Sequence, residues 1–217
     1  MNSTAYLKND IKFVKATTYS MIMACDSNGG IGYKNSLPWG RCDVDMKWFR
    51  ASTLGKIIIM GRTTFESLDS KPLPGRINIV LSTTLDSQIG KDWNKENEND
   101  VKKGYLIILK DVEAVRKFIE NSLGILHNGG EVMVIGGAQI YSAFWDVCSR
   151  LYLTTFDSTF DSDVQVQIPM ENFDLIYLDK RSRLNPQFAI YDCVKDDSRP
   201  LIITREELQS CLKSLTI

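Results

Sequence analysis

The sequence has few of the side chains that bind metal ions. It contains one histidine, His127, and five cysteines, and no two cysteines form a CxxC pair. Structural zinc sites are built from closely spaced cysteine and histidine ligands. We therefore expect no metal site, and we interpret the five cysteines as reduced thiols of a cytoplasmic protein.

The chain also lacks an excess of charge of either sign and a long apolar run. Twenty-six lysines and arginines oppose 27 aspartates and glutamates, for a formal net charge of −1. This balance gives no overall field that would attract nucleic acid or an acidic membrane surface. The first residues, MNSTAYLKNDIKFVKA, contain no continuous apolar stretch of the signal-peptide or membrane-spanning kind. We expect neither nucleic acid nor a membrane as partner, and a small-molecule substrate instead.

Length and composition indicate one domain. The 217 residues are 43% hydrophobic and 24% charged, which is enough apolar material for a single core. We predict an N-terminal extension over residues 1–18, a catalytic domain over 19–195 and a C-terminal extension over 196–217.

Short apolar runs rich in β-branched residues predict strands. They are YSMIMAC from Tyr19, KIIIM from Lys56, INIVLS from Ile77, YLIIL from Tyr105, EVMVI from Glu131 and RLYLTTF from Arg150. Helix-like segments lie between several of them: DMKWFRASTL from Asp45, DVEAVRKFIEN from Asp111 and AQIYSAFWDVC from Ala138. This alternation predicts the α/β class, with a central mixed, mostly parallel sheet of about eight strands and helices on both faces.

Two further regions depart from that alternation. DLIYLD from Asp174 and QFAIYDCV from Gln187 have a connection too short for a helical crossover, so we predict an antiparallel C-terminal edge hairpin. The polar segment KDWNKENENDVKKG, residues 91–104, has little periodicity and predicts an inserted surface loop.

The last residues predict a short helix. Thr204 and Glu207 have the spacing of a capping box. The apolar positions that follow share one face, which could pack on the domain or on a protein partner: Leu208, Cys211, Leu212 and Leu215. Packing on its own domain is favoured because the apolar stripe is short.

Two glycine turns follow predicted strands and precede predicted helices. In KIIIMGRTTFESL the strand ends at Gly61 and Arg62, and in EVMVIGGAQIYSAF it ends at Gly136 and Gly137. Free backbone N–H groups at a helix start can bind an anion, and two such starts can hold one dinucleotide. Either turn alone also occurs for packing reasons, and neither matches GxGxxG, which disfavours an ordinary Rossmann dehydrogenase.

The stretch GGIGYKNSLPWGRCDVDMKWFRASTLGK combines a glycine-rich loop with an acid at the start of an amphipathic helix. Pro38 and Trp39 stiffen the end of the loop. Asp45 begins the predicted helix one turn before Trp48 and Phe49, which places a carboxylate beside aromatic surface. From the helix pattern alone, an ordinary N-cap is the favoured role of Asp45.

Taken together, five segments resemble the successive signature segments of dihydrofolate reductases, in the family's order, and the match runs from Tyr19 to Val194. The segments are IGYKNSLPWGRCDVDMKWF, IIIMGRTTFESL, KPLPGRINIVLS, VMVIGGAQIY and LYLTTFDSTFDSD. The resemblance implies NADPH-dependent reduction of 7,8-dihydrofolate to tetrahydrofolate, which supports one-carbon metabolism and thymidylate synthesis. It also implies that antifolates bind.

The resemblance identifies Asp45 as the buried acid that bonds the 2-amino and N3 edge of the pterin, with Thr154 bonded to that acid. Asp43 remains a rival, because the step from Trp39 is one residue longer than in many bacterial members. Hydride transfer to C6 requires protonation of N5, which a carboxylate with a raised pKa can favour. Leu37 and Trp39 complete the group that the resemblance assigns to catalysis.

The other substrate residues implied by the resemblance form apolar walls and a carboxylate clamp. Arg76 matches the arginine that binds the α-carboxylate of the glutamate tail. Without the resemblance, Arg76 would be a surface residue at the exit of a turn. The wall residues are Ile22, Ala24, Met46, Phe49, Leu68, Leu73 and Ile135.

The cofactor residues implied by the resemblance fall into three groups. The loop over the nicotinamide ring, with neighbours of that ring, is Ala24, Ile31, Gly32, Asn35, Ser36, Leu37 and Tyr141. The pyrophosphate and adenosine group is Gly61, Arg62, Thr63, Thr64, Ile135, Gly136, Gly137, Ala138, Gln139 and Ile140. The group at the 2′-phosphate is Leu81, Ser82 and Thr83. Gln139 stands where many members have a basic residue, which leaves Arg62 as the chief cation for the 2′-phosphate.

Two alternatives stay open at the level of sequence. A pyrimidine reductase of riboflavin synthesis would share the fold and the nicotinamide site, but should lack both the LPW loop leading to an acid and the LPGR clamp. A non-catalytic partner-binding protein on the same fold should show a decayed site. Both features of the reductase site are present in the chain, so we rank both alternatives below it.

Overall fold

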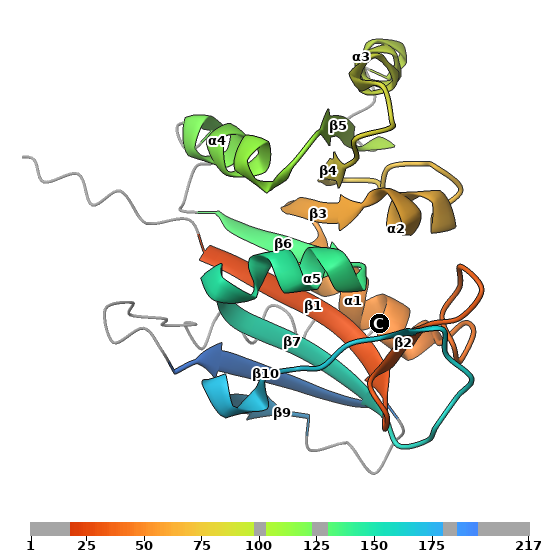
Figure 1. Ribbon diagram of the computed structural model, residues 1–217, viewed down its shortest axis with the longest axis vertical. Helices are drawn as coiled ribbons and strands as arrows, with labels where there is room; N and C mark the ends of the chain where they lie inside the picture. The colour runs from red at the N-terminus through yellow and green to blue at the C-terminus, as the bar shows by residue number, and fades with distance from the viewer. Residues whose placement is uncertain (1–17, 98–102, 123–129, 180–185, 195–217) are drawn as a thin grey trace, which may run out of the picture.

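A central eight-stranded sheet organises the protein. The computed structural model describes residues 18–97, 103–122, 130–179 and 186–194. The strands of the sheet are β1 (Thr18–Asp26), β3 (Ile57–Gly61), β4 (Ile77–Leu81), β5 (Tyr105–Leu109), β6 (Glu131–Gly136), β7 (Cys148–Phe156), β9 (Phe173–Leu178) and β10 (Gln187–Cys193). Their spatial order is β5-β4-β3-β6-β1-β7-β10-β9 (Figure 1).

The sheet is parallel except at one edge. The pairs from β5 through β7 are parallel, whereas β10 is antiparallel to both β7 and β9. This confirms the predicted mixed, mostly parallel sheet and its antiparallel edge hairpin. The run Ile57–Met60 is fully buried, as expected for an inner parallel strand covered on both faces.

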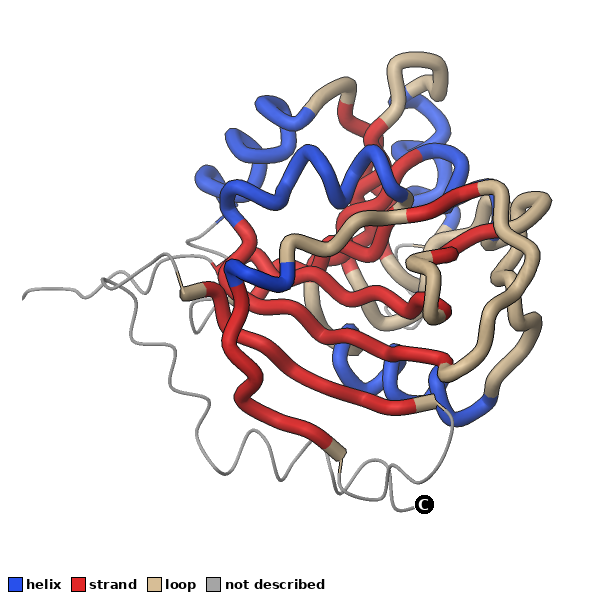
Figure 2. Tube along the Cα trace, turned by 60° about the horizontal axis from the view of Figure 1, so that its bottom comes forward, coloured by secondary structure: helices blue, strands red, loops and turns tan. Residues whose placement is uncertain are grey.

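Five helices accompany the sheet in the described part of the chain. They are α1 (Asp43–Thr53), α2 (Arg62–Ser67), α3 (Ser87–Glu96), α4 (Val112–Ser122) and α5 (Ala138–Phe144), with short 3-10 turns η2 (Trp145–Val147) and η3 (Met170–Asn172). Alternate strand residues enter two apolar clusters, because successive side chains of a strand point to opposite faces. One cluster packs against α4 and α5 and the other against α1 and α2, so helices cover both faces as predicted (Figure 2).

Helix α1 begins earlier than the sequence pattern indicated. Its first residue is Asp43, and Cys42 occupies the N-cap position without a side-chain cap bond. Asp45 is therefore the third residue of the helix, and the N-cap interpretation of this residue was wrong. The first turn is still acidic, which favours the positive end of the helix dipole.

The predicted loop over residues 91–104 was wrong in its first part, because residues 91–96 belong to α3. Asp86 caps this helix by accepting a hydrogen bond from the backbone N–H of Gln88 at 2.9 Å. Trp93 is half-buried in the core cluster of the α1 face, and its Nε1 donates to the carbonyl of Gly104 at 3.1 Å. Contacts with β5 thus stabilise a helix over residues 91–96, where the hydrophobic periodicity of the sequence is weak.

A small second sheet was not predicted. It pairs β2 (Gly30–Gly32) with β8 (Val164–Gln165) in antiparallel orientation. The predicted N-terminal extension, apart from Thr18 in β1, and the predicted C-terminal helix lie outside the described residues. In the part of the chain that the structure describes, no helix is long and apolar enough to cross a membrane.

Candidate active site

Several candidate residues gather where the parallel strands end, whereas Arg76 directly precedes the first residue of β4. Ala24 near the end of β1 is paired with Thr154 of β7, and the neighbouring strand β6 ends at Gly136. Open α/β sheets bind ligands at this carboxyl edge, because loops and helix starts converge there. The sheet therefore brings together residues from both ends of the sequence.

Asp45 and Thr154 form a buried pair at this edge. Their exposed fractions are 7% and 1%, and their side chains are hydrogen-bonded. Burial raises the pKa of Asp45, and the bond from Thr154 opposes part of that rise. Trp48, one turn further along α1, anchors the helix in the apolar cluster. The pair is the arrangement expected of an acid that meets a nitrogen-rich ring.

The rival acid, Asp43, lies in a different environment. Its side chain is largely exposed and bonded to Arg41, with 2.8 Å between Oδ1 and Nε. That bond and the charge of Arg41 lower the pKa of Asp43. Of the two acids, Asp45 alone is buried beside Thr154.

The predicted apolar walls differ in exposure. Ile22 and Ile135 are buried in one cluster, and Phe49, Leu68 and Leu73 pack against it. Met46 and Leu37 are exposed apolar side chains, at 43% and 40%. Exposed apolar groups of this kind are available for contact with a ligand.

Arg76 is buried, which corrects its interpretation from residues alone as a surface residue. Its exposed fraction is 6%, and its guanidinium lies over the ring of Phe49 with 5.8 Å to the centroid. Burial, with a smaller effect from the charge of Arg50, lowers the pKa of Arg76 to about 10. Among the described residues, none accepts a hydrogen bond from its Nε. A buried cation with an unpaired N–H fits a ligand carboxylate.

The two glycine turns lie side by side, and Gly61 and Gly136 leave little room for a side chain. A Cβ on Gly61 would come within 3.0 Å of Cγ1 of Ile140, and one on Gly136 within 3.1 Å of the Tyr141 hydroxyl. Gly61 and Gly137 are the N-cap residues of α2 and α5, and neither helix start has a side-chain cap bond. The peptide bond between Gly136 and Gly137 is cis. Uncapped N–H groups facing a glycine cradle fit a pyrophosphate group.

Other predicted cofactor residues surround these turns. Arg62 is exposed and bonded to Glu66 with 2.6 Å between Nη1 and Oε1, and Thr63 and Gln139 are also exposed. Ser82 is buried, and its Oγ accepts the backbone N–H groups of Thr84 and Leu85 at 3.1 and 2.9 Å. Of the remaining members, Leu81 ends β4, and Thr83 is an exposed residue two positions beyond it. The others lie in the first turns of α2 and α5: Thr64, Ala138 and Ile140.

The glycine-rich loop forms a tight turn beyond β2. The N–H of Tyr33 donates to the carbonyl of Ser36 at 2.8 Å, and the reverse bond is 3.0 Å. Asn35 adopts a left-handed conformation at the tip, whereas Ile31 packs against the core. At the end of the loop Trp39 stacks on Phe156, with 4.2 Å between ring centroids. Among the described residues, the indole Nε1 of Trp39 has no acceptor.

Tyr141 connects the two sides of the site. It is 4% exposed, and its hydroxyl donates to the carbonyl of Ile22 at 2.8 Å, which ties α5 to β1. Burial raises the pKa of Tyr141, so the phenol stays neutral. The structure thus places Tyr141 between the glycine turn and the strand that carries Ala24.

One residue of this region was missed at the level of sequence. Asp26, at the end of β1, accepts three backbone N–H groups. An aspartate directly before Ser, Asn and Gly is a typical Asx-turn signal, so part of this role was readable. Within the described ranges, no cluster of metal-ligating side chains is found.

Comparison with known proteins gives a consistent result. Residues 18–191 match the family model described as dihydrofolate reductase. The dihydrofolate reductase of Haemophilus influenzae is 32% identical over 190 residues, which cover 87% of this chain and 99% of that protein. That of Buchnera aphidicola from Acyrthosiphon pisum is 38% identical over 138 residues, covering 64% and 71% of the two chains.

A solved structure shares the fold. Dihydrofolate reductase from Enterococcus faecalis, complexed with NADP(H) and RAB-propyl, superposes with a TM-score of 0.60 and 24% identity. The match covers 82% of this chain and 96% of that one. With a family match over most of its length, and the buried acid, glycine turns and arginine in place, this chain belongs to the dihydrofolate reductase family.

Proposed function

We propose that the site around Asp45 is where this dihydrofolate reductase converts 7,8-dihydrofolate to 5,6,7,8-tetrahydrofolate with NADPH. The observation that carries the proposal is the buried pair of Asp45 and Thr154, placed at the same sheet edge as the glycine turns. The pyrimidine reductase and the non-catalytic scaffold are not favoured, because the family match covers most of the chain.

On the substrate side, Asp45 orients the pterin ring and favours protonation of its N5 atom. The carboxylate accepts hydrogen bonds from the 2-amino and N3 edge, and Thr154 fixes the orientation of that carboxylate. A desolvated carboxylate with a raised pKa strengthens a bond to a cationic ring and so favours protonation at N5. Leu37 and Trp39 cover the ring, and Arg76 binds the α-carboxylate of the glutamate tail. Antifolates with a similar ring and tail compete for these groups.

On the cofactor side, residues of the two glycine turns hold the dinucleotide. NADPH, when bound, supplies the hydride. The N–H groups at the starts of α2 and α5 bind pyrophosphate, and residues 32–37 exclude water from the nicotinamide. Arg62 is the cation available to the 2′-phosphate, since position 139 holds glutamine. We also place the protein in the cytoplasm, where the free thiols of its described cysteines are maintained.

The test compares Asp45→Asn with the matched variant Asp43→Asn. NADPH oxidation is followed with dihydrofolate, with NADH and a folate-free blank alongside, and methotrexate is added last. We expect methotrexate-sensitive turnover by the wild type and a severe loss of hydride transfer in Asp45→Asn, with NADPH binding largely preserved. Asp43→Asn should be mild, because Asp43 is an exposed side chain. Equal loss of NADPH binding and turnover in Asp45→Asn would argue for a structural role, and greater damage in Asp43→Asn would reject the assignment.

A further inference from the structure

Asp26 is a buried carboxylate that the proposed chemistry does not use. It is 3% exposed and is the last residue of β1. Its Oδ1 accepts the N–H groups of Asn28 and Gly30 at 2.9 and 2.7 Å, and its Oδ2 accepts the N–H of Phe160 at 2.9 Å. Burial opposes ionisation, but these three donors hold the pKa of Asp26 below its usual value. Asp26 is therefore an anion bonded to two separate stretches of backbone.

These two stretches lead into the two strands of the small sheet. Gly30 begins β2, and Phe160 precedes β8. The segments are also paired directly, because the N–H of Val166 donates to Gly29 at 2.9 Å and that of Asp163 donates to Gly32 at 3.0 Å. Asp26 fixes both strands to the end of β1, beside Ala24.

The same region also contacts the far end of the glycine-rich loop. Trp39 stacks on Phe156 and packs edge-on to Phe160, with 6.1 Å between the latter centroids. Phe160 is the residue whose backbone Asp26 binds. The carboxylate thus sets the position of the beginning of the loop directly, and of its end through Phe160.

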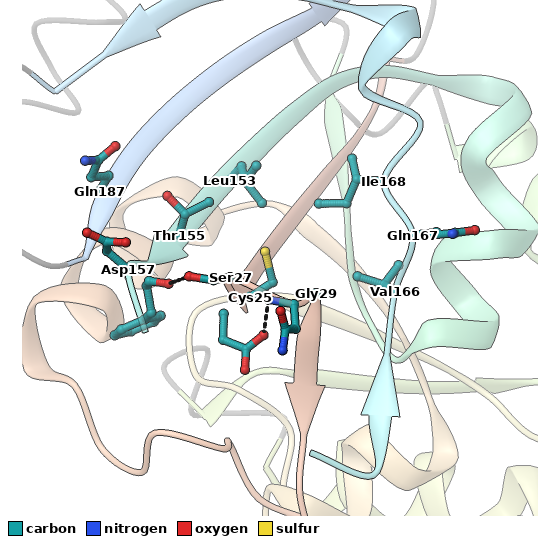
Figure 3. A pocket seen from close by; sticks show the side chains of 13 residues that line it. Cys25, Ser27, Gly29, Leu153, Thr155, Asp157, Val166, Gln167, Ile168 and Gln187 are labelled. Carbon is teal, nitrogen blue, oxygen red and sulfur yellow. Dashed lines mark hydrogen bonds between the residues drawn. The ribbon is translucent and has the colours of Figure 1, made fainter. Parts of the chain in front are cut away.

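The turn formed by residues 26–30 borders an open pocket. A pocket of about 560 Å³ lies between Ser27–Gly29 and Val166–Ile168, next to Leu153 and Thr155 (Figure 3). The turn is therefore not fully packed on this side. Its position depends on hydrogen bonds, which include those of Asp26 and a bond from the Ser27 hydroxyl to the carbonyl of Phe156 at 3.2 Å.

We propose that Asp26 is a positioning residue for hydride transfer, which holds residues 30–37 closed over the nicotinamide site through the backbone of Asn28, Gly30 and Phe160. The inference rests on the proposed function, which assigns residues 32–37 to the cofactor. A carboxylate is required because both of its oxygens accept hydrogen bonds. An asparagine would turn an NH₂ group toward one of the N–H donors.

The experiment measures amide hydrogen exchange without any ligand, in the wild type, Asp26→Asn and the control Asp161→Asn. Asp161 is an exposed acid in the same segment, so its substitution makes the same charge change. In Asp26→Asn we expect exchange at residues 28–34 and 158–164 to rise about tenfold, with the central sheet unchanged. Single-turnover hydride transfer should fall about tenfold and NADPH should dissociate faster, while methotrexate binding stays within about twofold of the wild type. The control should match the wild type.

Each contrary result has a distinct meaning. Wild-type exchange in Asp26→Asn overturns the proposal, whatever its turnover. Faster exchange throughout the central sheet would assign Asp26 to general stability and also overturns it. Asp26→Ser, which keeps one acceptor in a smaller side chain, must give the same regional pattern. A wild type that fails to oxidise NADPH with dihydrofolate would reject the proposed function instead, because the exchange is measured without substrate.

Discussion

Asp45 and Arg76 are buried charges that form no ion pair among the described residues. Desolvation penalises the charged form of each, so each destabilises the empty protein. A pterin ring and a glutamate tail supply the missing partners. The cost in stability therefore marks these positions as binding groups.

We predict that Asp45→Asn is more stable than the wild type at neutral pH. The pKa of Asp45 in the folded protein lies above its ordinary value of 3.8. Its burial therefore lowers the free energy of unfolding fully at pH values above the folded pKa, and this loss vanishes below pH 3.8. We expect Asp45→Asn to unfold at higher urea concentration than the wild type at pH 7, with the difference lost near about pH 3. Urea titrations at both pH values measure this. An unchanged midpoint at pH 7 would contradict the desolvation argument.

The second residue-scale prediction concerns Arg76→Lys. A lysine keeps the charge but loses the planar pair of N–H donors that fits a carboxylate. We expect KM for dihydrofolate to rise about 10- to 100-fold, with NADPH binding unchanged. Steady-state kinetics with dihydrofolate and with an analogue lacking the glutamate tail provide the check, and Arg41→Lys is an exposed control. An equal loss for both substrates would place the effect elsewhere.

At the scale of elements, α3 protects the edge of the sheet. β5 has β4 on one side, and on the other Asn94 of α3 pairs with its backbone. The Asn94 side chain donates to the carbonyl of Leu106 at 2.8 Å and accepts its N–H at 3.0 Å. Gly90 permits the close approach, since a Cβ there would lie 2.9 Å from the Leu106 carbonyl oxygen. The helix thus replaces a neighbouring strand.

We predict that Asn94→Leu destabilises the protein without changing kcat. Each unpaired buried backbone group costs about 1–3 kcal/mol, and β5 lies at the opposite edge from the hairpin, four places from β1. Thermal unfolding and steady-state turnover of the same preparation test this. Lys95→Ala, an exposed change on the same helix, should have little effect on either. A lower kcat at saturating substrate and cofactor would contradict this prediction, because it would show that α3 influences the active site.

At the scale of the whole molecule, a charged network joins three inner strands at the end of the sheet opposite to the glycine turns. The carboxylate of Glu131 accepts hydrogen bonds from Ser20, Lys56 and Tyr152. Ser20 lies in β1, Lys56 directly precedes β3, and Tyr152 lies in the middle of β7, so one side chain connects three inner strands. Burial alone would raise the pKa of Glu131, but the charge of Lys56 and the hydrogen bonds of Lys56 and Ser20 lower it.

Glu131→Gln should therefore have the opposite pH dependence to Asp45→Asn. The folded pKa lies below 4.5, so the stabilisation is present above pH 4.5 and is lost as the pH falls through the folded pKa. We expect a loss of about 1–3 kcal/mol at pH 7, because the partly exposed Lys56 loses its charged partner. Urea unfolding between pH 7 and acid measures it, with Glu171→Gln as an exposed control. A constant difference at all pH values would contradict the network.

Local patterns in the amino-acid sequence were enough to predict the class of fold, the inner strands, the glycine turns and the family. Those features follow from short ordered motifs and from hydrophobic patterns that repeat every two residues in a strand and every 3.6 residues in a helix. Local chain geometry imposes these periods. Helix α1 was likewise predictable to within two residues of its start.

Tertiary structure decided the rest, because it depends on contacts between distant residues. The choice between Asp43 and Asp45 rests on contact with Thr154 in β7. The burial of Arg76, the ordering of residues 91–96 by β5 and the bond between Asp26 and Phe160, 134 residues apart, also lie outside any local pattern. A local pattern determines on which face of its helix or strand a side chain lies. The hydrogen-bond partners of that side chain and the polarity of its surroundings are set only when the elements pack together.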